Sequence, residues 1–256
     1  MSSDLLTPER WLAQVPLAPH ERLYLVLSDA SEAKPLAALR KIGNLLAPLP
    51  VWRDTPYADW FEVMPYVLEL TAQSPFLSWI ADSDCRDWGW LAVSSNTPEQ
   101  LVAHLRGLTQ VKLPTGNPVF FRFWDGRQWL PTLDFLGAEA GDLLPGLSRY
   151  LINGQARTLA SSVKREAKTY PWWEVPPALL EHLSGASPET LIDNSLQWLS
   201  EDHPALYDAV PIPHLRHKIA RFLERSAPDP SRQDALLAYL SRELAVGEFL
   251  AREANR

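Results

Sequence analysis

Apolar residues follow two different spacings along the chain. A short continuous apolar run occupies residues 23–27, and its β-compatible composition predicts a buried strand. Residues 65–70 and 88–94 are mainly apolar and predict two further strands. Residues 33–46 instead carry apolar side chains at helical spacing, and residues 76–80 suggest a second, shorter helix. Because strands and helices alternate, the first half predicts a sheet flanked by helices.

Two helix starts and one hairpin are marked by specific side chains. Residues 7–9 read Thr-Pro-Glu, which places a capping hydroxyl before a proline at the first helical position. Residues 97–100 read Thr-Pro-Glu-Gln, a capping box that opens a helix to about residue 108. Residues 110–113 and 119–124 flank a Pro-Thr-Gly-Asn turn, which predicts a β-hairpin.

The second half of the chain changes character, and from about Ala156 onward we predict helices only. The helical segments are residues 157–168, 187–199, 214–225 and 231–253, with a proline-rich extended linker at residues 171–177. We therefore expect an α+β or α/β fold: an N-terminal lobe with a small mixed β-sheet flanked by helices, followed by an all-helical C-terminal lobe. The boundary is placed near Asn153 and Gly154, giving domains of residues 1–153 and 154–256.

Charge and cysteine content narrow the classes of function. The 256 residues carry 24 Lys and Arg against 31 Asp and Glu, a net charge of −7, which argues against nucleic acid and anionic membrane surfaces as partners. Cys85 is the only cysteine, so no intramolecular disulfide is possible. Neither a signal peptide nor an apolar run of about 18 residues is visible, and we expect a cytoplasmic protein without membrane insertion.

The usual catalytic and ligand-binding motifs do not appear in the sequence. His214 and His217 have helical spacing, but Arg216 and Lys218 beside them disfavour a metal ion, so a solvated face is the expected reading. Cys85 lies among acidic residues, which disfavour a reactive thiolate, so an inert cysteine is expected. Phosphate-binding loops and nucleophile elbows are missing. We expect no metal and no cofactor.

The segment from Phe121 to Asp125 is chemically unusual because it alternates aromatic residues with an arginine and ends in an acid. On a strand, Arg122 and Trp124 would face one way and Asp125 the other. An arginine inside an apolar strand needs a partner, and Asp29, at the end of the first strand, is a candidate. A structural ion pair and a catalytic Arg/Asp set remain open.

Four segments in this order resemble the type VI secretion effector chaperones, the Tap or Tec adaptors, a former family of unknown function. They are residues 23–30, 65–70, 88–94 and 119–125, and the resemblance covers roughly residues 23–151. The strand end Arg122-Phe123-Trp124-Asp125 is its most specific part. The family pattern usually has proline after the aspartate, whereas Gly126 stands here.

The resemblance implies a non-catalytic adaptor that binds the N-terminal region of a cognate effector and helps place it on the spike protein VgrG. No catalytic residues carry over from the family. Trp172 and Trp173, stiffened by flanking prolines, are candidate partner-binding residues, although they could equally pack the linker against a lobe. The alternatives are an immunity protein that blocks a toxin and a hydrolase using an Arg/Asp cleft.

Overall fold

The computed structural model describes residues 5–42, 47–159, 165–186, 188–225 and 233–243. The chain divides into two compact units, Met1–Leu179 and Leu180–Arg256. The first unit contains every strand found in the described residues, and the second is helical.

A six-stranded sheet forms the centre of the first unit, with strand order β2-β3-β1-β4-β7-β8 and antiparallel pairing throughout. The strands are β1 (Arg22–Ser28), β2 (Leu49–Pro50), β3 (Pro65–Leu70), β4 (Gly89–Ser94), β7 (Leu147–Ile152) and β8 (Gln155–Thr158). The α+β class is thereby confirmed.

The central strand β1 is buried on both faces, which explains its continuous apolar run. Leu23, Leu25 and Leu27 point into one core cluster, while Tyr24 and Val26 point into the other. Side chains alternate across a strand, so a run without polar positions is what a strand between two helical layers requires.

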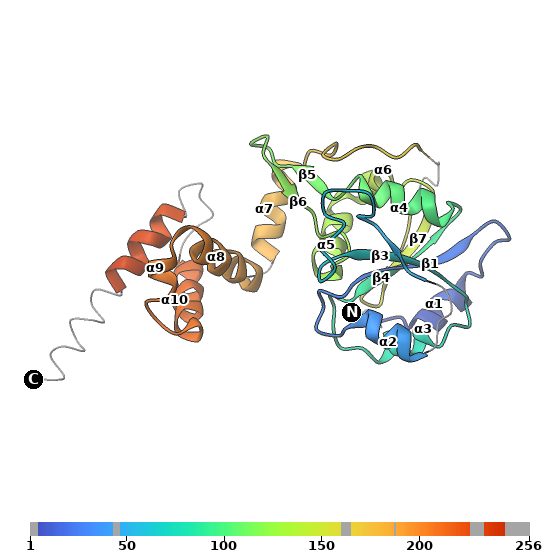
Figure 1. The fold of residues 1–256 in the computed structure, drawn as a ribbon, viewed down its shortest axis with the longest axis horizontal. Helices are drawn as coiled ribbons and strands as arrows, with labels where there is room; N and C mark the ends of the chain where they lie inside the picture. The colour runs from blue at the N-terminus through green and yellow to red at the C-terminus, as the bar shows by residue number, and fades with distance from the viewer. Residues whose placement is uncertain (1–4, 43–46, 160–164, 187, 226–232, 244–256) are drawn as a thin grey trace, which may run out of the picture. The chain divides into compact units, whose positions relative to one another are not determined.

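Helices cover both faces of the sheet (Figure 1). The face bearing Leu25 packs against α1 (Pro8–Gln14), α2 (Pro35–Ile42) and α3 (Phe76–Asp82). The face bearing Val26 packs against α4 (Pro98–Arg106), α5 (Gly126–Leu136) and α6 (Ala140–Leu143), with a short 3-10 turn, η1 (Gly137–Glu139), before α6. The predicted caps are present, because Thr7 caps α1 and Thr97 forms a capping box with Gln100 on α4.

A second, two-stranded sheet is formed by β5 (Gln110–Lys112) and β6 (Pro118–Phe120). The hairpin was predicted, but its second strand ends at Phe120, four residues earlier than expected. Residues 51–52 form a turn directly after β2.

The expected domain boundary at Asn153 and Gly154 does not coincide with the division of the chain. Both residues have positive φ, 50° and 74°, and form the two-residue turn that joins β7 to β8. Asn-Gly is the preferred sequence for such a hairpin turn. Strand β8 therefore lies where only helices were predicted, and residues 165–169 are not helical either. Residues 160–164 lie outside the described residues.

The helical unit contains α8 (Pro188–Asp202), α9 (Pro204–Tyr207), α10 (Ile212–Arg225) and a helical segment at residues 233–243, while α7 (Pro177–Ala186) spans the division between the units. Apolar side chains at helical spacing on α8 and α10 form its core together with Leu236 and Leu240. Part of the predicted helix 231–253 lies outside the described residues. No helix in the described ranges is long and apolar enough to cross a membrane.

His104 on α4 is a buried titratable group in the first unit. Its side chain is 4% exposed, and its Nε2 bonds the backbone oxygen of Leu143. Burial lowers the pKa of His104 below its ordinary value, and the nearby Lys168 lowers it further. The unfolded chain, with its ordinary imidazole pKa of about 6.5, therefore binds this proton first as the pH falls.

We expect the free energy of unfolding to fall as the pH drops below about 6.5, since protonation favours the unfolded chain. The contribution of His104 should be constant above that value. Denaturant titrations at pH 7.5 and 5.5 measure the difference, and His104→Gln should reduce it. An exposed histidine, in His217→Gln, supplies the control. An unchanged pH dependence in His104→Gln would contradict the expectation.

Candidate functional site

The segment at residues 121–125 is a turn rather than a strand, and it connects β6 to α5. Trp90 on β4 donates its indole N–H to the backbone oxygen of Phe123 over 2.9 Å. Asp125 is the N-cap of α5, where its carboxylate accepts the backbone N–H of Arg127. The alternation of side chains in this segment therefore does not correspond to a strand, and the predicted strand over these residues is wrong.

The carboxylate of Asp125 is almost fully buried, at 1% exposure, and is held by two arginines. Arg127 donates from Nε to Oδ1 over 3.1 Å and from a terminal nitrogen to Oδ2 over 2.9 Å. Arg122 forms a longer ion pair of 3.6 Å with the same carboxylate. Both arginine side chains are about half exposed, so the buried member of this motif is the acid.

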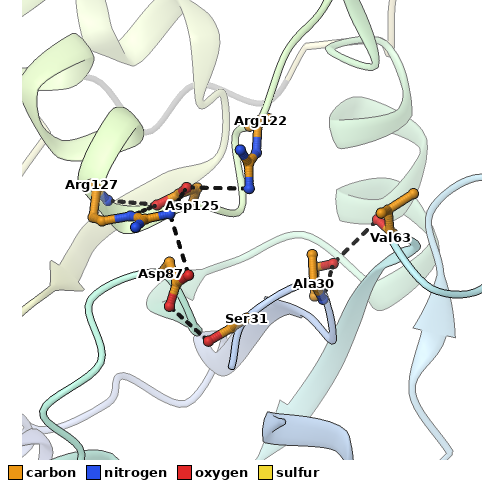
Figure 2. Close-up of polar contacts among 8 residues, drawn as sticks. Ala30, Ser31, Val63, Asp87, Arg122, Asp125 and Arg127 are labelled. Atoms are coloured by element: carbon orange, nitrogen blue, oxygen red, sulfur yellow. Dashed lines mark hydrogen bonds and ion pairs between the residues drawn. The ribbon is translucent and has the colours of Figure 1, made fainter. Parts of the chain in front are cut away.

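The network continues to the neighbouring strands of the main sheet. Arg127 also lies 3.3 Å from a carboxylate oxygen of Asp87, just before β4, and Asp87 accepts the hydroxyl of Ser31 over 2.7 Å. Segments that follow β1, precede β4 and open α5 are thereby joined by side chains (Figure 2).

Asp29 is not the partner of Arg122. Its carboxylate accepts the backbone N–H of Leu36 at the start of α2, and its backbone oxygen accepts Lys34 Nζ. Arg122 is also not buried in a strand. It lies in a turn with its side chain half exposed, and it forms its ion pair with Asp125, three residues further along the chain.

Gly126, which stands where the family pattern has proline, is required by close packing here. A Cβ at this position would lie 2.8 Å from the backbone oxygen of Arg86 and 3.0 Å from Asn153 Nδ2. A contact as short as that with the Arg86 backbone oxygen is essentially never found for real Cβ atoms, so a larger residue would require α5 or the segment before β4 to shift.

A partly exposed aromatic cluster lies beside this turn, and the sequence pattern does not identify it. Its members are Tyr57, Trp60, Phe120 and Tyr170, with Phe61 next to them in sequence; together we name them the aromatic surface. Ring centroids of Phe120 lie 4.8 Å from Tyr57 and 5.3 Å from Trp60, and Tyr57 lies 6.2 Å from Tyr170. Trp60 is 47% exposed and Phe61 is 65% exposed.

Two buried tryptophans support the aromatic surface from below. Trp52 contacts Tyr57, Trp60 and Phe120 with ring centroids 6.1–6.3 Å apart. Trp124, which is 4% exposed, lies 5.6 Å from Trp52. Edge-to-face packing of this kind holds the exposed rings in defined positions. Trp124 of the predicted motif therefore belongs to the support of the aromatic surface.

Trp172 and Trp173 are half-buried against the first unit. The ring of Trp172 lies 6.4 Å from that of His104 and is covered by Lys168, while Trp173 lies 5.4 Å from Phe121. The backbone of the linker pairs with β5, because Lys112 donates to Trp173 and accepts from Val175. The linker thus packs on the first unit and continues from the aromatic surface through Tyr170.

The metal and cysteine candidates of the sequence can be placed in the described ranges. No three His, Cys, Asp or Glu side chains gather there to hold a metal ion. Cys85 lines a cavity of about 260 Å³ between α1 and α3, but the lining residues of that cavity include no histidine that could activate the thiol.

We expect Asp125→Ala to destabilise the first unit by about 3 kcal/mol, because it removes both the cap of α5 and the buried partner of two arginines. Arg122→Ala should cost about 1 kcal/mol or less, since its side chain is half exposed. Thermal unfolding of the two variants measures the contrast. Equal losses would show that the buried acid is not the key member.

Comparisons with known proteins agree with the resemblance seen in the sequence. Residues 23–140 match the family described as "Domain of unknown function (DUF4123)". "Accessory protein VasW" of Vibrio cholerae serotype O1 is 27% identical over 124 residues, which cover 47% of this chain and 41% of VasW. The chain thus matches less than half the length of that relative. No solved structure matches it significantly.

The matched residues contain the Asp125 turn and most of the aromatic surface, whereas Tyr170, Trp172 and Trp173 lie beyond them. Residues 23–140 therefore match the DUF4123 family model, in agreement with the resemblance of the ordered segments to the type VI secretion adaptors.

Proposed function

We propose that this chain is an adaptor that binds the N-terminal region of a cognate type VI secretion effector and helps load it onto the VgrG spike. The family of residues 23–140 supports an accessory role in secretion. The observation that carries the proposal is the aromatic surface, since ordered aromatic side chains at the protein surface are typical of protein-binding sites. In this role the adaptor works in the cytoplasm.

The aromatic surface has the composition of an interface core with a polar rim. Exposed Asp54, Asp59 and Glu62 lie on the same loop as Trp60 and Phe61, and Arg53 precedes them. Aromatic rings give large contact areas with few rotatable bonds, so little conformational entropy is lost on binding. Because Trp52 already orders the rings, the free adaptor presents them in a defined arrangement.

We also propose that Trp172 and Trp173 contribute to client binding by extending the aromatic surface along the linker. Their half-burial gives each a second role in holding the linker against β5. Loss of these rings should therefore affect stability and binding together, unlike loss of Trp60 or Phe61.

An affinity-tagged chain purified from a secreting strain should bring down a cognate effector and VgrG. The double variant Trp60→Ser, Phe61→Ser should lose the effector while its melting temperature stays within a few degrees of the original, because both side chains are exposed. Val15→Ser, at an exposed apolar residue after α1, is the matched control.

Two outcomes would count against the adaptor role. A folded bait that recovers neither partner would contradict it, and so would recovery of a toxin whose activity the chain blocks without affecting its delivery. The latter result would identify an immunity protein.

For the double variant Trp172→Ala, Trp173→Ala we expect a clear drop in melting temperature together with weaker effector binding, because both rings pack on the first unit. Calorimetry and quantitative pull-down provide the two measurements. Unchanged effector binding by a variant that remains folded would exclude the linker from recognition.

A further inference from the structure

The register of the β5–β6 hairpin determines which backbone groups face outward. Leu113 donates to Asn117 and Phe121 donates to Thr109, so the odd-numbered positions form the hydrogen-bonded pairs of this hairpin. The backbone groups of the even-numbered positions consequently point away from the partner strand. These positions are Gln110 and Lys112 on β5, and Pro118 and Phe120 on β6.

The outer edge of β5 is already used by the chain itself. Lys112 donates its N–H to the oxygen of Trp173 over 2.8 Å, and its own oxygen accepts Val175 N–H over 2.8 Å. The linker thus adds a short parallel strand at this edge, with the bridge at Glu174. This pairing confirms that the even-numbered backbone groups of the hairpin face outward.

The outer edge of β6 presents the same kind of groups to solvent. The N–H and oxygen of Phe120 and the oxygen of Pro118 point outward, and within the described ranges no hydrogen bond to the Phe120 N–H is found. Pro118 has no N–H, so the edge offers one complete donor–acceptor pair, at Phe120, rather than a long template for uncontrolled pairing.

An apolar side chain stands beside this open pair. Phe120 is 39% exposed and packs against Trp60 and Tyr57. Gln110, opposite Phe120 on β5, donates its side-chain amide to the Tyr57 hydroxyl, so the aromatic loop lies on the Phe120 face of the hairpin. A strand added at Phe120 would place its own paired residue on that same face, against the exposed rings.

We propose that the aromatic surface binds an extended client segment that adds to the edge of β6. The segment pairs its backbone with Phe120 and seats one apolar side chain against Phe120 and Trp60. An extended segment fits better than a helix because the edge offers an unpaired donor and acceptor, and a helix has already used its own backbone groups. This inference rests on the proposed adaptor function and specifies how its client is recognised.

The inference can be tested without knowing the client, using a random 12-residue peptide library displayed on phage. Selection on the full chain should enrich peptides with alternating apolar and β-branched residues. Phe120→Ala should weaken a selected peptide by removing the ring. Phe120→Pro should weaken it by about a further fivefold, because it also removes the outward N–H but leaves the inner bonds of residues 119 and 121 in place.

Amide hydrogen exchange on the unaltered chain gives a test that does not depend on whether the proline variant folds. A saturating selected peptide should slow exchange at Phe120 by at least about tenfold, whereas Phe121, already bonded to Thr109, should change little. Enrichment of helical peptides, unchanged exchange at Phe120, or no enrichment at all would overturn the inference. Co-purification of effector and VgrG is a separate test, so the adaptor role can stand if strand addition fails.

Discussion

The buried carboxylate of Asp125 fixes the point where the hairpin ends and α5 begins. It accepts hydrogen bonds from Arg127, caps the helix and forms an ion pair with Arg122. A carboxylate this deeply buried must be fully paired, because an unpaired charge in the interior is strongly unfavourable. The position of the preceding turn, and with it that of Phe120 at the surface, therefore depends on this one group.

The aromatic surface depends on a second constraint, the buried layer beneath it. Trp52 and Trp124 pack edge-to-face and carry the exposed rings of the loop and the hairpin. Exposed aromatic residues are unfavourable in water, so their ordered arrangement suggests that a partner covers them. Because Trp124 directly precedes Asp125, the polar network and the aromatic layer position each other.

The sequence predicted those elements whose pattern has a single physical cause. Strands buried on both faces have continuous apolar runs, as in β1, and the Thr97 capping box marks the start of α4 without reference to the rest of the fold. Residues 121–125 were wrongly predicted as a strand because alternating aromatic and charged residues resemble a strand pattern. These residues form a turn because Trp90 donates a hydrogen bond to the Phe123 backbone and Asp125 caps α5. The first interaction is tertiary and the second is local, and neither can be read from the alternation of side chains. Asn153-Gly154, the predicted boundary, also has the Asn-Gly sequence that is preferred in a tight hairpin turn. The loop bearing Trp60 has no periodicity at all, so its aromatic residues become a surface only when Trp52 and Phe120 are brought together.

The small β5–β6 sheet shows how backbone pairing can set the position of a bound segment while side-chain contacts supply the binding free energy. At its β5 edge the linker makes two backbone hydrogen bonds in the described residues, and Trp172 and Trp173 add apolar contacts with the core of the first unit. One or two exchanged hydrogen bonds add little net free energy in water, whereas a buried aromatic ring adds considerably more. Backbone pairing at this edge therefore sets the position of the linker, and the side chains hold it there. Under the proposed strand addition, a client at the β6 edge would meet the same division of roles: Phe120 would supply one backbone pair, and the rings of Trp60 and Phe120 would supply the apolar contact. Such clients would be selected mainly by the side chain seated on the rings, so segments of otherwise different sequence could share the same edge.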